Sequence, residues 1–126
     1  MKKVALFLAN GFEEIEALGT VDILRRAGIP VQTVSINNEK SVTGAHRITV
    51  LADTTFPEAN FSGVDVLVLP GGMPGAKNLN EQEALKKKVK EHAEKGKIVA
   101  AICAAPMVLG GLGLLEGKKA TCYPGF

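Results

Sequence analysis

The chain has 126 residues, which is enough for one domain with its own hydrophobic core. Hydrophobic residues make up 46% and charged residues 22%, a composition that indicates a globular protein and excludes a disordered chain. The net charge of +2, with five Phe, one Tyr and no Trp, argues against nucleic-acid binding, which needs basic clusters and aromatic side chains on which bases stack.

The first half of the chain alternates between strand and helix patterns. The continuous apolar run 4–9 is typical of a strand buried in a parallel sheet. A helix is predicted from the acidic stretch 13–16 to Ala27, because acidic residues favour a helix start and Gly28 favours a helix end. A strand follows over 31–36, then a small β-hairpin from segments 41–43 and 48–52. Residues 53–62 are expected to form a loop, and 64–69 another buried strand.

The second half continues the alternation. Asn80 and Glu83 have the spacing of a capping box, which predicts a helix from there to Gly96 with a solvated lysine-rich face. The run 98–102 predicts a fully buried strand, Cys103 a turn, and the next residues a helix to about Leu115. A last strand is predicted over 120–123. This order predicts one α/β domain over 1–126, a doubly wound parallel sheet with helices on both faces.

Cys103 is the first candidate for chemistry, because it lies where a strand changes to a helix. The small residues Ala101, Ala104 and Ala105 allow a tight turn there, as in a nucleophile elbow. The helix start is expected to stabilise a thiolate and to lower the pKa of the thiol. The alternative is a buried core thiol, the commonest state of cysteine.

Two further loops, 10–16 and 70–75, are expected beside Cys103, because each follows a strand and the carboxyl ends of parallel strands meet at one edge of a sheet. On a helical wheel Glu16 lies on the apolar side with Thr20 and Ile23, which makes it a candidate proton donor or acceptor; the alternative is a carboxylate that reaches solvent. Gly71 and Gly72 can turn backbone amides towards an anion or oxyanion, or can simply form a turn.

Other polar residues give weaker signals. His46 lies in a loop and can approach a pocket or remain exposed, whereas His92 is expected on a solvated helix face. Cys122 is expected to be a buried strand thiol, with a resolving-cysteine role as the alternative. The histidines and cysteines do not have zinc-ligand spacing, and the glycines match neither a Walker A motif nor a dinucleotide fingerprint, so we expect no metal and no nucleotide cofactor.

Four matching segments in order make the chain similar to the ThiJ/PfpI family, from Lys3 to Pro124 without an evident gap. The matching segments are Gly-Phe-Glu-Glu-Ile-Glu at 11–16, Val-Asp-Ile-Leu-Arg-Arg-Ala-Gly at 21–28, Leu-Pro-Gly-Gly-Met-Pro-Gly-Ala-Lys-Asn-Leu at 69–79 and Ala-Ala-Ile-Cys-Ala-Ala-Pro at 100–106.

The resemblance implies a flavodoxin-like α/β sandwich that forms homodimers and needs no cofactor. It implies that Cys103 is the nucleophile, that a protonated Glu16 hydrogen-bonds its thiolate, and that the amides of Gly72 and Ala104 line an anion pocket. The implied substrates are reactive dicarbonyls such as methylglyoxal and glyoxal, or glycated protein adducts. Oxidative-stress sensing, holdase chaperone action and intracellular peptidase or amidase activity are the alternatives.

Two departures from the family pattern affect these expectations. Tyr123 stands before Pro124 where some relatives have a histidine near the thiol, which weakens the peptidase and amidase readings. Members also continue beyond this segment, so the domain is expected to be incomplete at its C-terminus, with a separate C-terminal fragment as a possible partner. The absence of long apolar runs and of a signal-peptide pattern predicts a cytoplasmic protein that does not enter membranes.

Overall fold

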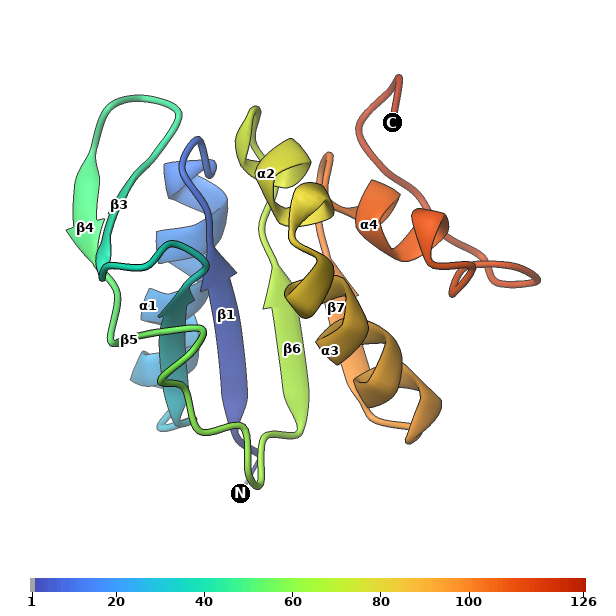
Figure 1. The fold of residues 1–126 in the computed structure, drawn as a ribbon, viewed down its shortest axis with the longest axis horizontal. Helices are drawn as coiled ribbons and strands as arrows, with labels where there is room; N and C mark the ends of the chain where they lie inside the picture. Colours follow the sequence, from blue (N-terminus) through green and yellow to red (C-terminus); the bar gives the residue numbers. More distant parts are fainter. Residues whose placement is uncertain (1) are drawn as a thin grey trace.

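The computed structural model describes residues 2–126 and contains a five-stranded parallel sheet with a separate antiparallel hairpin (Figure 1). The order in the parallel sheet is β5-β2-β1-β6-β7. Its strands are β1 (Val4–Leu8), β2 (Val31–Ser35), β5 (Thr54–Thr55), β6 (Val66–Leu69) and β7 (Ile98–Ala101); the hairpin pairs β3 (Ser41–Thr43) with β4 (Thr49–Leu51).

Helices cover both faces of the sheet, as the sequence predicts. In Figure 1, α1 (Glu14–Arg26) lies behind the sheet, and α2 (Gly75–Glu81), α3 (Glu83–Glu94) and α4 (Pro106–Gly111) lie in front of it. The central strand β1 pairs with β2 on one side and with β6 on the other. The strands after β1 are thus added first on one side of it and then on the other, which makes β1 the point where the strand order reverses. In folds of this kind, ligands bind at the carboxyl end of the strand at this point.

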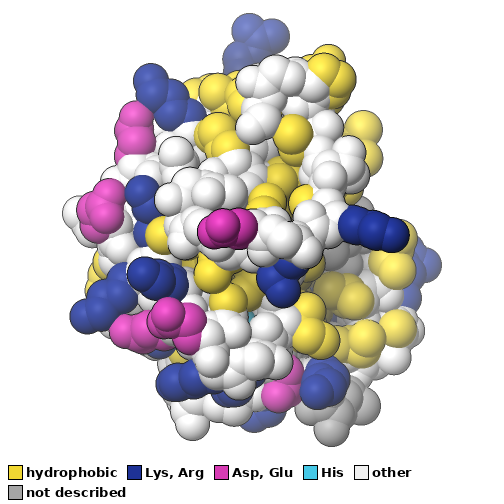
Figure 2. Space-filling model, turned by 90° about the vertical axis from the view of Figure 1, so that its right-hand side faces the viewer, with side chains coloured by type: hydrophobic (Ala, Val, Ile, Leu, Met, Phe, Trp, Pro, Cys, Tyr) yellow, Lys and Arg dark blue, Asp and Glu magenta, His cyan; other side chains and the backbone are white. Residues whose placement is uncertain are grey.

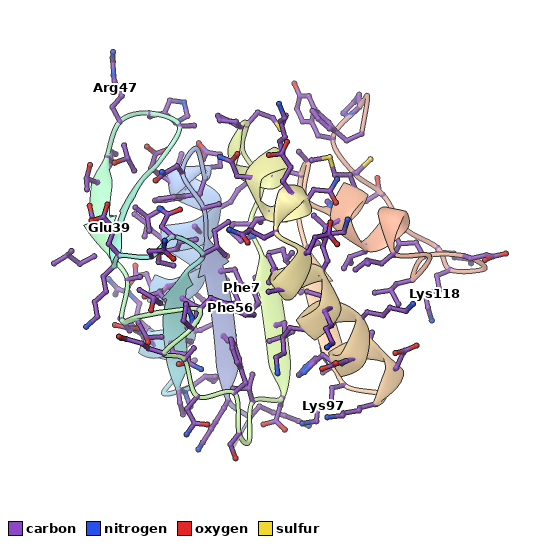
Figure 3. All side chains as sticks on the ribbon, in the orientation of Figure 1. Phe7, Glu39, Arg47, Phe56, Lys97 and Lys118 are labelled. Atoms are coloured by element: carbon purple, nitrogen blue, oxygen red, sulfur yellow. The ribbon has the colours of Figure 1, made fainter. Side chains whose placement is uncertain are left out.

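Strand β1 is buried along its whole length, as its continuous apolar pattern predicts. Its side chains alternate between two cores: Phe7 packs with the cluster under α2, α3 and α4, and Leu6 and Leu8 pack with the cluster under α1. The ring of Phe7 lies 6.1 Å from that of Phe56 and 5.9 Å from that of Phe61, and Figure 3 shows Phe7 and Phe56 directed towards each other. These two apolar layers pack on the two faces of the sheet and fix the positions of the carboxyl ends of its strands.

The structure differs from the sequence prediction around residue 80. The predicted capping box is wrong: Asn80 lies inside α2, and α3 begins at Glu83 after the N-cap residue Gln82. Helix α2 was not predicted, because Pro74 and Gly75 are residues typical of turns. Its first turn is held by main-chain hydrogen bonds, among them Ala76 N–H to Gly72 O at 2.8 Å.

The predicted C-terminal elements are also partly wrong. Residues 120–123 form no strand, and α4 ends at Gly111 rather than near Leu115. The predicted strand 98–102 is shorter by one residue and is not fully buried, since Ile98 in β7 is 53% exposed and Ile102, just after β7, is 51% exposed. Hydrophobic side chains gather on this side of the molecule (Figure 2). Strand β7 is thus an apolar strand at the edge of the sheet whose side chains are only partly covered.

The helices of residues 2–126 lack the combination of length and hydropathy that crossing a membrane requires.

Candidate active site

Cys103 lies on a strained turn between β7 and α4. Its φ angle is +62°, in the left-handed region that costs a residue other than glycine roughly 1–3 kcal/mol. The turn is held by hydrogen bonds on both sides: Ile102 N–H donates to Leu69 O at 3.2 Å, and Ala105 N–H donates to Ile102 O at 3.0 Å. The predicted turn at Cys103 is therefore present, and it presents a partly exposed thiol at the carboxyl end of the sheet.

Gly71 brings Cys103 and Glu16 together. A Cβ atom at Gly71 would lie 2.6 Å from Cys103 Cβ, 2.6 Å from Glu16 Oε1 and 2.9 Å from Ile102 O, so only glycine fits. The Gly71 N–H donates a 2.9 Å hydrogen bond to Glu16 Oε1. Three segments far apart in the sequence thus meet at this glycine.

Glu16 is directed towards the site, as the helical wheel predicts, but the side of α1 that the wheel identifies as apolar is not its buried side. Ile23, on the same predicted face, is 68% exposed, and the buried residues of α1 are Glu14, Ala17 and Val21. Glu16 lies beside the Cys103 thiol because the Asn10–Glu13 turn sets the start of α1 against the loop after β6. Glu13 N–H fixes that contact with a 2.9 Å hydrogen bond to Gly71 O.

The backbone N–H groups of Gly72 and Ala104 lie near enough to the Cys103 thiol to lower its pKa. Gly72 has a φ angle of +93°, and a Cβ atom there would collide with the backbone of Gly11 and Glu13. The residue at this position must therefore be glycine for two reasons, its conformation and the closeness of the opposing backbone. The two amides form a donor pair of the kind that stabilises negative charge on a bound atom.

The predicted direction of the Cys103 pKa is wrong. Burial of the thiol and the hydrogen bond and negative charge of Glu16 raise its pKa above the ordinary value, and the amides of Ala104 and Gly72 lower it by less. The helix argument fails because α4 begins three residues after Cys103 and has only six residues.

A raised thiol pKa means that Cys103 keeps its proton to a higher pH than a free thiol does. Removing that proton would place two negative charges in contact, which is costly in a partly buried site. The reactivity of the thiol therefore depends on a group that can take up or return this proton, and the carboxyl group of Glu16 lies beside it.

The ring of His46 is bound to the carboxylate of Glu14, so it is not free to approach the Cys103 thiol. It lies between β3 and β4, where its Nδ1 is 2.8 Å from Glu14 Oε1. Glu14 is buried, and its Oε2 accepts the N–H groups of His46 at 2.8 Å and Ile48 at 3.3 Å. Gly44 packs directly on this carboxylate. No sequence signal separates Glu14 from its neighbours, because its role depends on a loop thirty residues away.

These hydrogen bonds also account for a cluster that has the composition of a metal site. Ligand-type atoms of Glu13, Glu14 and His46 lie within 4.8 Å of one another. However, Glu13 Oε2 caps the helix at Ile15 N–H, and Glu14 is bonded to the 44–48 loop. The cluster thus holds the hairpin against the start of α1.

The remaining candidates lie elsewhere or play other roles. The prediction of a solvated His92 is wrong: it is 7% exposed, its Nε2 lies 3.0 Å from Asp65 O near the start of β6, and burial lowers its pKa. Tyr123 is 59% exposed, and its backbone N–H donates to Cys103 O at 2.7 Å. Cys122 is exposed rather than buried in a strand.

The fold and this site define an α/β protein with a cysteine on a strained turn, a carboxyl group beside it and two amides facing it. The chain belongs to the DJ-1/PfpI family, whose profile matches residues 2–126. The family resemblance read from the motifs is thereby confirmed.

Relatives cover almost all of this chain but are longer. It is 44% identical to DJ-1 homolog B of Arabidopsis thaliana over 99% of this chain and 29% of that protein. It is 36% identical to the Parkinson disease protein 7 homolog of Danio rerio, over 98% and 66% of the two. A protein named deglycase from Pyrococcus horikoshii is 37% identical, over 98% and 73%. The chain thus spans two thirds or less of several relatives.

Solved structures of relatives have the same flavodoxin-like fold. The oxidised DJ-1 of Toxoplasma gondii matches with a TM-score of 0.93 and 40% identity, over 98% of this chain and 68% of that one. The DJ-1 of Schizosaccharomyces pombe matches with a TM-score of 0.87 and 30% identity, over 97% and 68%.

Proposed function

We propose that this protein is a cysteine-dependent enzyme without a cofactor that acts on reactive dicarbonyls, such as methylglyoxal and glyoxal, or on glycated protein adducts. The observation that carries the proposal is the meeting of Cys103, Glu16 and two backbone amides around one partly exposed sulfur. A relative named deglycase supports a reaction of this class.

In the reactive form Glu16 is protonated and Cys103 carries the negative charge. The thiolate adds to an aldehyde carbon and forms a hemithioacetal, and Glu16 gives its proton to the carbonyl oxygen and then moves the proton needed for rearrangement. The amides of Gly72 and Ala104 stabilise the developing oxyanion. Hydrolysis of the resulting thioester releases lactate from methylglyoxal and regenerates the thiol.

Replacing the nucleophile tests this mechanism directly. Wild-type protein given methylglyoxal should form lactate, and Cys103→Ser should lose the activity because a serine hydroxyl stays protonated beside Glu16. Cys122→Ser is the matched control, since it also removes one thiol but leaves Cys103 in place. Equal turnover by the wild type and Cys103→Ser would exclude this mechanism.

A second candidate function is oxidative-stress sensing or holdase action through oxidation of Cys103. It is favoured by the partial exposure of the thiol and by the carboxyl group that can hydrogen-bond an oxidised sulfur. After mild peroxide, an intact mass with a gain of oxygen confined to Cys103, without dicarbonyl turnover, would favour this candidate.

Peptidase or amidase activity has less support, because it needs a base beside the thiol. His46 is bonded to Glu14, and His92 is bonded to Asp65 at the opposite end of β6. A histidine from a second subunit within hydrogen-bond reach of Cys103 would be required.

A further inference from the structure

Two cysteines meet at the Cys103 turn through the backbone of the C-terminal segment. Tyr123 N–H donates to Cys103 O at 2.7 Å, so the α-carbons of Cys103 and Cys122 are within about 7.5 Å by covalent geometry. In the parallel pair of β1 and β2, Leu8 O accepts from Ile36 N–H while its register partner is the preceding residue, Ser35. By the same offset, Cys122 would be the residue opposite Cys103.

Few main-chain hydrogen bonds hold the segment that carries Cys122. Residues 116–126 are all exposed. Within 119–126, the N–H groups of Tyr123 and Phe126 donate main-chain hydrogen bonds. Disulfide α-carbons are usually 4.4–6.8 Å apart, so bonding requires a shift of this segment that also turns the two Cβ atoms towards each other. Because hydrogen bonds hold the turn at Cys103, the shift would be made by the segment of Cys122.

We propose that Cys122 is the resolving cysteine of a peroxide-driven redox pair with Cys103. This inference rests on the proposed reactivity of the Cys103 thiolate, and it assigns Cys122 a role that dicarbonyl chemistry does not need. The redox state of the pair would switch the nucleophile off reversibly.

The reaction has two balanced steps. The Cys103 thiolate attacks one oxygen of hydrogen peroxide; an S–O bond forms and the O–O bond breaks. The proton held by Glu16 leaves with the second oxygen as water, so the sulfur is oxidised to sulfenic acid by two electrons and the peroxide is reduced. The Cys122 thiol then attacks the Cys103 sulfur, the S–O bond breaks, and the released hydroxide takes the Cys122 proton and leaves as water.

The disulfide would protect Cys103 from further oxidation. Without a resolving thiol, a sulfenic acid continues to sulfinic acid, which ordinary thiols do not reduce. With Cys122 in place, dithiothreitol should restore the thiol and the dicarbonyl activity together.

The test compares the wild type with Cys122→Ser after hydrogen peroxide, by intact mass and by peptide mapping without reduction. The wild type should lose two hydrogen atoms, show a linked peptide of Cys103 and Cys122, and recover with dithiothreitol. Cys122→Ser should instead be labelled by dimedone at Cys103 and, without dimedone, gain two oxygen atoms severalfold faster than the wild type.

Other outcomes would overturn the proposal in distinguishable ways. If both proteins gain two oxygens at Cys103 at equal rates with no linked peptide, the resolving role is wrong while the reactivity of Cys103 stands. If the linked peptide comes only from disulfide-bonded dimers on a gel without reductant, the pairing within one chain is wrong. If dimedone labels Cys103 in neither protein, its proposed reactivity fails as well.

Discussion

Gly71 is the residue on which the geometry of the site depends most directly. In Gly71→Ala the new methyl group would meet Cys103 Cβ and Glu16 Oε1, both at 2.6 Å, so one of them must move. We expect a loss of roughly 1–3 kcal/mol in the free energy of unfolding, as for other overpacked sites, and a strong loss of dicarbonyl turnover. Urea unfolding and a lactate assay measure the two effects.

The matched control is Gly19→Ala in α1, where nothing lies within 4 Å of the new Cβ atom. Because glycine lowers helix stability relative to alanine, this change should be neutral or stabilising by up to about 1 kcal/mol. If Gly71→Ala behaves like Gly19→Ala in both assays, the close packing around Gly71 has no functional importance.

Replacing Glu16 should make the Cys103 thiol easier to ionise and yet lower turnover. Its charge and hydrogen bond help to raise the pKa of Cys103, so the neutral Glu16→Gln should lower that pKa and move the pH midpoint of iodoacetamide alkylation to lower pH. Turnover should fall by roughly 10²–10⁴-fold, because an amide cannot transfer the proton.

Asp22→Asn serves as the control for Glu16→Gln, since it removes one exposed carboxylate from the same helix. It should leave both the alkylation profile and turnover unchanged. A midpoint that stays in place or rises in Glu16→Gln would contradict the assigned role of the Glu16 charge.

At the scale of elements, the contact between the hairpin loop and α1 should depend on pH. The hydrogen bond and charge of Glu14 raise the pKa of His46 above 6.5. Burial alone would raise the pKa of Glu14, but its hydrogen bonds from His46 and Ile48 outweigh this and lower it below 4.5. Stability from His46 is therefore present below pH 6.5 and lost as pH rises through its folded-state pKa. Stability from Glu14 is present above pH 4.5 and lost as pH falls through its folded-state pKa.

The pair should therefore contribute most between about pH 4.5 and 6.5. The difference in Tm between the wild type and His46→Gln should be largest there and should shrink as pH rises towards about 9. Arg47→Gln, at the adjacent position where Figure 3 shows the side chain directed away from the molecule, should give a small difference that does not change with pH. A difference for His46→Gln that is constant across this range would contradict the ion pair.

The elements that could be predicted from the sequence are those with a local signal. The apolar run of β1 and the stops at Gly28 and Gly96, both with φ near +76°, mark elements by their own residues. Helix α2 lacks such a signal, since main-chain contacts to the 11–13 turn allow a Gly-Pro-rich segment to become helical. The cysteine turn was also predictable from its small residues, whereas Glu16 was assigned to the site only through the family motif, because the apolar face taken from the helical wheel is wrong. The pKa of Cys103 was not predictable, because it depends on burial and on the nearby Glu16.

At the scale of the whole molecule, apolar side chains are exposed on two separate surfaces. One is a groove of 390 Å³ against β6 and β7, lined by Val66, Val68, Ala100 and Ile102 among others. The second comprises exposed apolar residues of α1 and of the hairpin, two elements that pack on the same core cluster: Ile15 and Ile23 on α1 are 81% and 68% exposed, and Leu51 on β4 is 78% exposed. Isolated exposed apolar residues are ordinary, but large ones that recur on one helix face indicate a contact surface.

We propose that the surface of Ile15, Ile23 and Leu51 joins two copies of this chain in a homodimer. Residues 15 and 23 are eight positions apart, so they share one side of α1, and an apolar patch of this kind can pair with its own copy about a twofold axis. Ile15→Glu should convert the dimer into a monomer, because two carboxylates would be buried in one interface. Size-exclusion chromatography with light scattering measures the mass. Ala84→Glu, which adds the same charge at an exposed position of α3 on the opposite face of the sheet, should leave the dimer intact. A wild-type monomer, or equal dissociation of both variants, would exclude this interface.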